Sequence, residues 1–194
     1  MSNTPLRVAV IVASTRQGRF GSTVARWFDQ QAGQHPGLEI EVLDLAETPL
    51  PVVLGGDLST EDSAILAPVT ELLERADAYV VLTPEYNHSY PAALKNLIDW
   101  HYTQWRAKPV GFVSYGGLGG GLRAVEHLRP VFAELHAVTI RDGVSFHSPW
   151  TDFDAEANHR DQEGCATAAK LMLDQLAWWG RALRTARAEL PYSA

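Results

Sequence analysis

The chain has 194 residues, of which 46% are hydrophobic and 20% charged, and this composition is typical of one folded domain with a substantial core. Its net charge of -7 argues against a general nucleic-acid surface, which needs clustered Lys and Arg, but it does not exclude a single phosphorylated ligand. Because it has one cysteine, no signal-peptide pattern and no apolar run near the roughly 20 residues of a membrane span, we expect a single cytoplasmic domain over residues 1–194, without a membrane partner.

Apolar, strand-like runs alternate with helical patterns along the chain. The first run, at residues 6–12, is rich in β-branched side chains and nearly continuous, as in a parallel strand that is covered on both faces. Residues 46–60, rich in Pro and Gly, predict a loop. The expected strands are 6–12, 38–43, 78–82, 110–114 and 137–140, and the expected helices are 22–32, 63–75, 91–105, 122–135 and 165–183.

Strands that alternate with helices of this length predict right-handed βαβ units and a parallel sheet. Five strands favour the flavodoxin-like order 2-1-3-4-5 over the six-stranded dinucleotide fold. The predicted fold class is therefore α/β: a three-layer flavodoxin-like fold with a five-stranded parallel sheet and helices on both faces. In such sheets ligands bind outside the carboxyl ends of the strands, so the loops that follow the first, third and fourth strands are the candidate site.

The loop after the first strand, residues 13–21, has the composition of an anion site. Amides at a helix N-terminus and the helix dipole attract negative charge. The hydroxyls of Ser14 and Thr15 can donate to phosphate oxygens, and Arg16 and Arg19 can add charge-assisted hydrogen bonds. A terminal monophosphate is favoured, because the loop lacks both G-x-G-x-x-G spacing and a P-loop lysine. The alternative is an ordinary Ser/Thr-capped helix with solvated arginines.

The loop after the third strand lies between Pro84 and Pro91, which restrict its backbone and predict a stiff segment. Its fixed amides and carbonyls would suit the hydrogen-bonding edge of a heteroaromatic ring, with Tyr86 available for apolar contact. The alternative is a rigid turn in which Asn87 and His88 only face solvent. The loop after the fourth strand is mostly glycine, which lets a backbone approach a ligand closely, although a flexible connection would look the same.

Three stretches of sequence, ASTRQGRFG, TPEYNHSYPAALKNLIDW and SYGGLGGGLRA, together resemble the NAD(P)H-dependent FMN reductase family of flavodoxin-like proteins. The resemblance covers roughly residues 6–140 with motif order and spacing kept, and the second stretch is highly specific. It implies FMN as cofactor and NADPH or NADH as electron donor. The implied phosphate ligands are Ser14, Arg16 and Arg19 within a first loop that also contains Thr15 and Gly21. The residues implied around the isoalloxazine are Pro84, Glu85, Tyr86 and Asn87 on one side and Ser114, Tyr115, Gly116 and Gly117 on the other.

Two departures from the family pattern concern the first loop. Ala13 stands where many members have Gly, and Arg19 and Gly21 stand where many have Ser and Asn. A monophosphate site survives these changes, because Arg19 adds positive charge, but the individual contacts differ from those of other members.

Members of the family are commonly dimers with the flavin near the subunit interface. The resemblance therefore implies a homodimer or a dimer of dimers as well as a small-molecule electron acceptor.

An aromatic cluster follows the second loop and could line the interface and the substrate pocket, or it could be a helix end packed in its own core. On the last helix we expect one of two adjacent tryptophans in the core and the other free for a partner subunit. The cluster is Trp100, His101, Tyr102 and Trp105, and the pair is Trp178 and Trp179.

The implied activity is FMN-dependent NAD(P)H oxidoreduction. Hydride would pass from the nicotinamide to flavin N5, and a free flavin, quinone or azo compound would then accept it at the same face, in a ping-pong cycle. The flavin carries this chemistry, so no catalytic side chain is required.

The sequence also allows two other functions. A non-enzymatic flavin-binding electron carrier or redox sensor is the main alternative. A serine hydrolase built on Ser114, Asp154 and His159 is more remote, because Phe112 stands where the nucleophile elbow needs Gly. No metal site is expected, since no two histidines are three or four residues apart. Residues 152–156 begin like a calcium loop but lack the required Gly.

Overall fold

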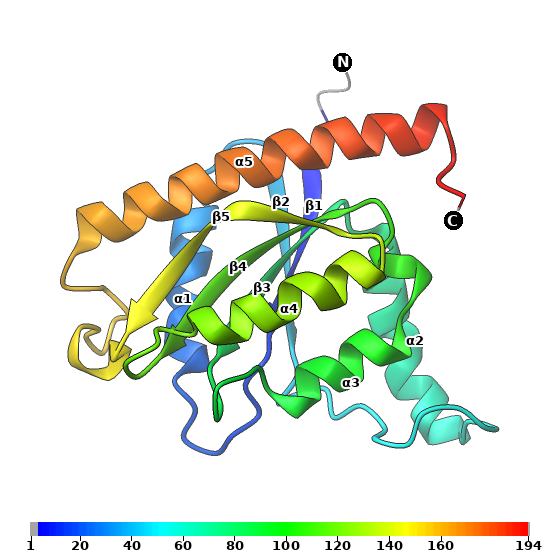
Figure 1. Cartoon of the computed structure of the whole chain (residues 1–194), viewed down its shortest axis with the longest axis horizontal. Coiled ribbons are helices and arrows are strands. Elements are labelled where there is room, and N and C mark those ends of the chain that lie inside the picture. The colour runs from blue at the N-terminus through cyan, green and yellow to red at the C-terminus, as the bar shows by residue number, and fades with distance from the viewer. Residues whose placement is uncertain (1–3, 194) are drawn as a thin grey trace.

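Five parallel strands form one sheet in the order β2-β1-β3-β4-β5 (Figure 1). The structure is a computed structural model and describes residues 4–193. The strands are β1 (Leu6–Val12), β2 (Leu38–Asp44), β3 (Ala78–Pro84), β4 (Pro109–Gly116) and β5 (Val138–His147). The flavodoxin-like α/β fold predicted from the alternating pattern is therefore confirmed.

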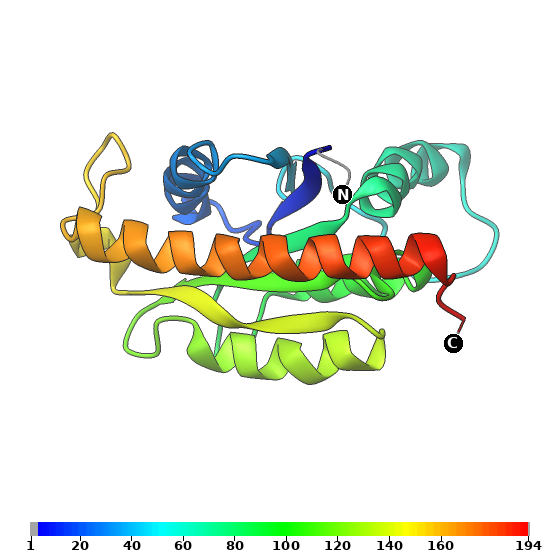
Figure 2. The same cartoon turned by 90° about the horizontal axis from the view of Figure 1, so that it is seen from above.

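Helices cover both faces of this sheet. The α-helices are α1 (Gly21–Ala32), α2 (Thr60–Arg75), α3 (Ala92–Trp100), α4 (Leu122–Glu134) and α5 (Gln162–Glu189), and the short 3-10 helices are η1 (Thr103–Trp105) and η2 (Pro149–Thr151). Helices α1 and α5 pack on one face, while α2, α3 and α4 pack on the other. Helix α5, coloured orange to red, runs across most of the molecule (Figure 2).

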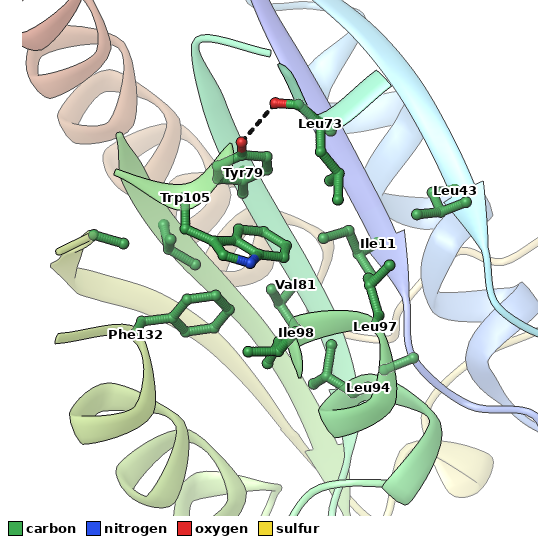
Figure 3. Close-up of a cluster of buried hydrophobic side chains, with 14 of the residues drawn as sticks. Ile11, Leu43, Leu73, Tyr79, Val81, Leu94, Leu97, Ile98, Trp105 and Phe132 are labelled. Carbon is green, nitrogen blue, oxygen red and sulfur yellow. Dashed lines mark hydrogen bonds between the residues drawn. The ribbon is translucent and has the colours of Figure 1, made fainter. Parts of the chain in front are cut away.

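The core follows from the two-residue period of the central strands. Strands β3 and β4 are buried along their whole length, so their side chains alternate between two apolar layers. Tyr79 and Val81 enter the layer beneath α2, α3 and α4, part of which is drawn in Figure 3. Val80 and Leu82 enter the layer beneath α1 and α5. The near-continuous apolar runs of the sequence are explained by this double burial.

Strand β5 is longer than expected, and the prediction of a strand limited to residues 137–140 is wrong. The Asp142-Gly143 pair resembles a turn, but here the strand passes through it with an irregular register opposite β4. A side chain at Gly143 would place its Cβ 2.9 Å from the carbonyl oxygen of Phe112, so glycine fits this close approach. The longer strand carries Ser145 and His147 to the carboxyl edge of the sheet.

The expected helix over residues 91–105 is also wrong, because the chain leaves α3 at His101 and continues into η1. The His101 ring is buried, its Nε2 lies 3.0 Å from Thr70 Oγ1, and burial lowers the pKa of this histidine. The Trp105 side chain is buried as well. The prediction that His101 and Trp105 line an interface is therefore wrong, and the alternative that they pack in the core of their own chain is confirmed. Tyr102 differs from them, because it is 50% exposed.

Helix α5 extends beyond the expected residues 165–183 at both ends. It begins after Asp161, whose side chain accepts a hydrogen bond from the Gly164 amide at 3.0 Å. Trp179 packs against the core, while Trp178 is 63% exposed and its predicted role toward a partner stays a prediction. Within residues 4–193, no helix has both the length and the apolar character needed to span a bilayer.

Candidate functional site

The three candidate loops meet at the carboxyl ends of β1, β3 and β4, which are neighbours in the sheet. These loops lie at one end of the sheet in Figure 1. Two hydrogen bonds join them directly. The Ser14 hydroxyl of the first loop lies 2.6 Å from the Tyr86 hydroxyl of the second loop, and the Glu85 amide donates to the Tyr115 carbonyl at 2.9 Å. Residues separated by about seventy positions in sequence therefore form one surface.

No side chain of the first loop caps helix α1 in the described structure. Phe20 occupies the N-cap position of α1 and supplies no side-chain hydrogen bond, so the first-turn amides have no side-chain cap. The alternative of a Ser/Thr-capped helix is therefore wrong. Thr15 and Arg16 are exposed, and Arg16 forms no ion pair with any residue that the structure describes. An unpaired cation in the preceding loop and helix amides without a side-chain cap are features that suit a phosphate group.

Arg19 has a different role in this structure from Arg16. Its Nη2 donates to Asp44 Oδ2 at 2.6 Å, its Nη1 also contacts that carboxylate, and Nη1 donates to the Ser14 carbonyl at 3.0 Å. The hydrogen bond with Asp44 raises the pKa of Arg19. The arginine therefore joins the first loop to the end of β2, and its charge is neutralised there. Its predicted contact with a phosphate stays a prediction, and Arg16 is the cation that remains unpaired.

The Tyr115 side chain points toward the start of α1, where its hydroxyl lies against Gly21, and its predicted place beside the isoalloxazine stays a prediction. Its side chain is 5% exposed, and its hydroxyl has no hydrogen-bond partner in the described part of the chain. A Cβ on Gly21 would lie 2.8 Å from this hydroxyl. The phenol therefore fills the space that a side chain at position 21 would need, which explains why glycine replaces the Asn of many family members.

The second loop is a two-residue hairpin. The Tyr86 amide donates to the Ser89 carbonyl at 2.8 Å, and the Ser89 amide donates back to the Tyr86 carbonyl at 3.1 Å. The two residues between them have left-handed backbones, with φ of 49° at Asn87 and 74° at His88. Hairpins of this kind normally use Asn-Gly, so a histidine at the second position is strained. The stiff loop expected from its prolines is present, with strain concentrated at His88.

Replacing His88 with glycine should raise the free energy of unfolding by about 0.5–1 kcal/mol. A left-handed backbone costs a residue with a side chain roughly 1–2 kcal/mol, and glycine removes this cost. Part of the gain is lost again, because glycine has more conformational freedom in the unfolded chain. Urea denaturation measures the difference. Ser89→Gly is the control, because Ser89 does not have positive φ and should lose stability. A loss of stability in His88→Gly would contradict the assignment of strain.

The side chain of Glu85 is a structural link. It is 8% exposed, its Oε1 accepts from Arg123 Nη1 at 2.7 Å, and its Oε2 accepts from the Arg123 amide at 3.3 Å. Because Arg123 lies in the first turn of α4, the carboxylate caps that helix and holds the second loop against the third. Glu85 can therefore contribute its backbone to a ring-binding wall while its side chain is already engaged.

The glycine-rich third loop is held from below by two serines. Ser114 and Ser145 both donate to the Gly120 carbonyl, at 2.9 and 2.8 Å. Gly121 has φ of 83°, and a Cβ there would lie 2.6 Å from Ser114 Cβ, so this backbone requires glycine. Ser145 was not predicted as a site residue, because the expected fifth strand ended at residue 140 and β5 continues to His147. The alternation of apolar Val144 and Phe146 with polar neighbours was the signal for a longer strand.

The hydrolase triad is not assembled, so that interpretation is wrong. The Ser114 hydroxyl donates to a backbone carbonyl, and Asp154 Oδ1 accepts from the amides of Glu156 at 3.0 Å and Asn158 at 2.8 Å. His159 Nδ1 instead lies 3.1 Å from the Cys165 sulfur. The segment that resembled a calcium loop is thus a turn closed by its own carboxylate. Across residues 4–193, no group of three or more His, Cys, Asp or Glu could hold a metal.

The chain is similar to known flavin-dependent oxidoreductases. Residues 6–151 match the model of the family described as NADPH-dependent FMN reductase. An NADPH:quinone oxidoreductase of Arabidopsis thaliana is 34% identical over 168 residues, covering 81% of this chain and 83% of the relative. An NAD(P)H-dependent FMN reductase of Schizosaccharomyces pombe is 34% identical over 122 residues, covering 59% of this chain and only 60% of that relative.

The fold comparison agrees with the sequence comparison. The flavoenzyme FerB, an NAD(P)H:(acceptor) oxidoreductase from Paracoccus denitrificans, superposes with a TM-score of 0.73 at 22% identity, covering 91% of this chain and 98% of FerB. At that identity the likeness shows the fold alone. The family match covers all three candidate loops and confirms the resemblance drawn from their motifs. The chain therefore belongs to the NADPH-dependent FMN reductase family.

Proposed function

We propose that the protein is an FMN-dependent NAD(P)H oxidoreductase that reduces a small acceptor such as a quinone, a free flavin or an azo compound. Its relatives are named as FMN reductases and quinone oxidoreductases, which supports this class of reaction. The observation that carries the proposal is the first loop. This loop carries the unpaired cation Arg16 and leads into the uncapped amides of α1, where the buried, unpartnered hydroxyl of Tyr115 lies against Gly21.

The residues present fit a flavin mononucleotide. Ser14, Thr15, Arg16 and the amides that begin α1 would hold the phosphate, since these groups donate hydrogen bonds and Arg16 carries positive charge. The backbones of residues 84–87 and 114–117 would line the two sides of the isoalloxazine. The hairpin and the glycine-rich loop are both held from behind by hydrogen bonds, so their amides and carbonyls have fixed directions.

Bound FMN would supply the redox chemistry, taking hydride from NAD(P)H and delivering it to the acceptor. The chain itself binds and orients. The Glu85 carboxylate is held in an ion pair with Arg123, and burial raises the pKa of Tyr115, so the structure does not set up either side chain as a general base. The protein's contribution is a wall of fixed backbone dipoles and an anion site, as expected where the cofactor carries the reaction.

We propose that the functional oligomer is a homodimer, and that two such dimers can assemble into a dimer of dimers. We also propose that the protein acts in the cytoplasm. Apolar side chains exposed in the loop before α2 support a second copy as partner, with Val52 84% and Val53 81% exposed. The Trp100 indole donates to the Pro51 carbonyl at 2.7 Å and fixes this loop beside α3. The unpaired thiol of Cys165 is consistent with a reducing compartment.

Sedimentation velocity tests the dimer. Val53→Asp should shift the protein toward the monomer, because a charge in a buried apolar interface is costly. Glu47→Asp, a conservative change at an exposed position of the same segment, should not. A wild-type protein that sediments as a monomer would contradict the proposed homodimer.

Turnover by the purified protein tests the proposed function. With FMN and a quinone present, we expect the protein to oxidise NADH or NADPH, which is measured as a loss of nicotinamide absorbance. The same assay determines which of the two donors is preferred. A protein that binds FMN but does not oxidise either nucleotide would be an electron carrier. A protein that binds no FMN would contradict the proposal.

A further inference from the structure

Three hydroxyl groups from three different segments meet at the start of α1. Ser14 belongs to the first loop, Tyr86 to the hairpin and Tyr115 to the end of β4. The Ser14 and Tyr86 hydroxyls are paired at 2.6 Å. The Tyr115 hydroxyl lies beside them, against Gly21, and is the member of the group that has no partner within residues 4–193.

A buried hydroxyl without a partner is costly, so its persistence at this place needs a reason. Phenylalanine would fill the same volume among the neighbouring apolar side chains without that cost. Burial raises the pKa of Tyr115, and a hydrogen bond from Ser14 to the charged form would oppose this only in part, so the phenol keeps its proton and can donate a hydrogen bond. The group is therefore a neutral donor held next to the loop that faces the anion.

The arrangement around Ser14 shows what this donor can serve. A serine hydroxyl donates one hydrogen bond and accepts up to two. When Ser14 donates its proton to a phosphate oxygen, its own oxygen is free to accept a hydrogen bond from a second donor, which would fix the direction of the hydroxyl. The Tyr115 hydroxyl and Ser14 Cβ both lie against Gly21, and Tyr115 is buried, while the Tyr86 hydroxyl comes from a partly exposed side chain on the other loop.

We propose that Tyr115 is a positioning residue of the phosphate site: its hydroxyl donates to Ser14 Oγ when Ser14 donates to the terminal phosphate of the flavin. This rests on the proposed function, because it takes FMN to be the ligand. The consequence is selectivity. The Tyr115 hydroxyl strengthens binding of the phosphorylated flavin and leaves binding of riboflavin, which lacks the phosphate, unchanged.

Affinities of Tyr115→Phe for FMN and for riboflavin, measured by quenching of flavin fluorescence, test the selectivity. We expect the affinity for FMN to fall roughly 3- to 10-fold, the loss of one hydrogen bond, and the affinity for riboflavin to stay within about twofold. In the Ser14→Ala background, Tyr115→Phe should have no further effect on FMN, because the two residues act through one chain of hydrogen bonds.

Thermal unfolding separates this role from a structural one. Without ligand, Tyr115→Phe should melt about 2–4 °C higher than the wild type, since an unpaired buried hydroxyl is removed. The matched control is Tyr79→Phe. The Tyr79 hydroxyl is equally buried but donates to the Leu73 carbonyl at 2.7 Å (Figure 3). This control should melt lower and bind both flavins as the wild type does.

The outcomes separate the two proposals. If wild-type protein binds FMN and Tyr115→Phe binds it equally well, the role of Tyr115 is overturned while the proposed function stands. Equal losses for FMN and riboflavin, or a lower melting temperature of ligand-free Tyr115→Phe, would also overturn it. If wild-type protein binds neither flavin, both proposals are overturned.

Discussion

Trp105→Ala is expected to lower the free energy of unfolding by about 3–5 kcal/mol, the range for removing a buried aromatic side chain. The indole is fully buried, with its ring centroid 4.7 Å from that of Tyr79 and 5.4 Å from that of Phe132. Figure 3 shows it between these rings. Its Nε1 also donates to the His101 carbonyl, which would lose that partner. Urea denaturation measures the loss.

Tyr102→Ala is the matched control for this prediction. Tyr102 lies three residues earlier in the chain and is 50% exposed, so its truncation should change the free energy of unfolding by no more than about 0.5 kcal/mol. If Trp105→Ala kept its stability and changed only the state of assembly, the side chain would belong to an interface rather than to the core.

Arg16→Ala is expected to weaken FMN binding by about 1.5–3 kcal/mol, the contribution of a hydrogen bond to a charged group. Arg16 is exposed and unpaired in the loop before α1, while Arg19 is held by Asp44. Loss of Arg16 therefore removes the free positive charge of the first loop. Riboflavin affinity should change little, because the missing contact involves the phosphate. Fluorescence titrations with both flavins measure the two effects.

Arg26→Ala is the control for net charge. Arg26 is exposed on α1 beyond the first turn, so its removal changes the total charge by the same amount without touching the loop. Its FMN affinity should stay near that of the wild type at physiological salt, where distant surface charges are screened. Equal losses in the two variants would point to a general electrostatic effect and would remove the phosphate contact assigned to Arg16.

The sheet could be predicted from the sequence because its signals are local. Continuous apolar runs mark β1 and β3, which are buried on both faces, and the helices between them leave few possible topologies. The errors occurred where a tertiary contact overrides local preference. Gly143 resembles a turn but fits against the Phe112 carbonyl, and His101 leaves the helix to bury its ring beside Thr70.

The position of the site was predictable for a similar reason, since the carboxyl ends of neighbouring parallel strands must lie together. The roles of single side chains were not. The predicted phosphate contact of Arg19 stays a prediction, but its pairing with Asp44 was not foreseen, because it depends on how the end of β2 lies beside the first loop. The orientation of Tyr115 toward Gly21 joins residues far apart in sequence and leaves no periodic signal.

The most direct measurement is a comparison of FMN and riboflavin binding to the purified wild-type protein, beginning with its absorption spectrum as isolated. We expect a yellow protein that releases FMN on denaturation, and a stripped form that binds FMN at least tenfold more tightly than riboflavin, because the first loop holds the phosphate. A colourless protein that does not bind added FMN, or one that binds both flavins equally, would contradict the assignment of these three loops as a flavin mononucleotide site.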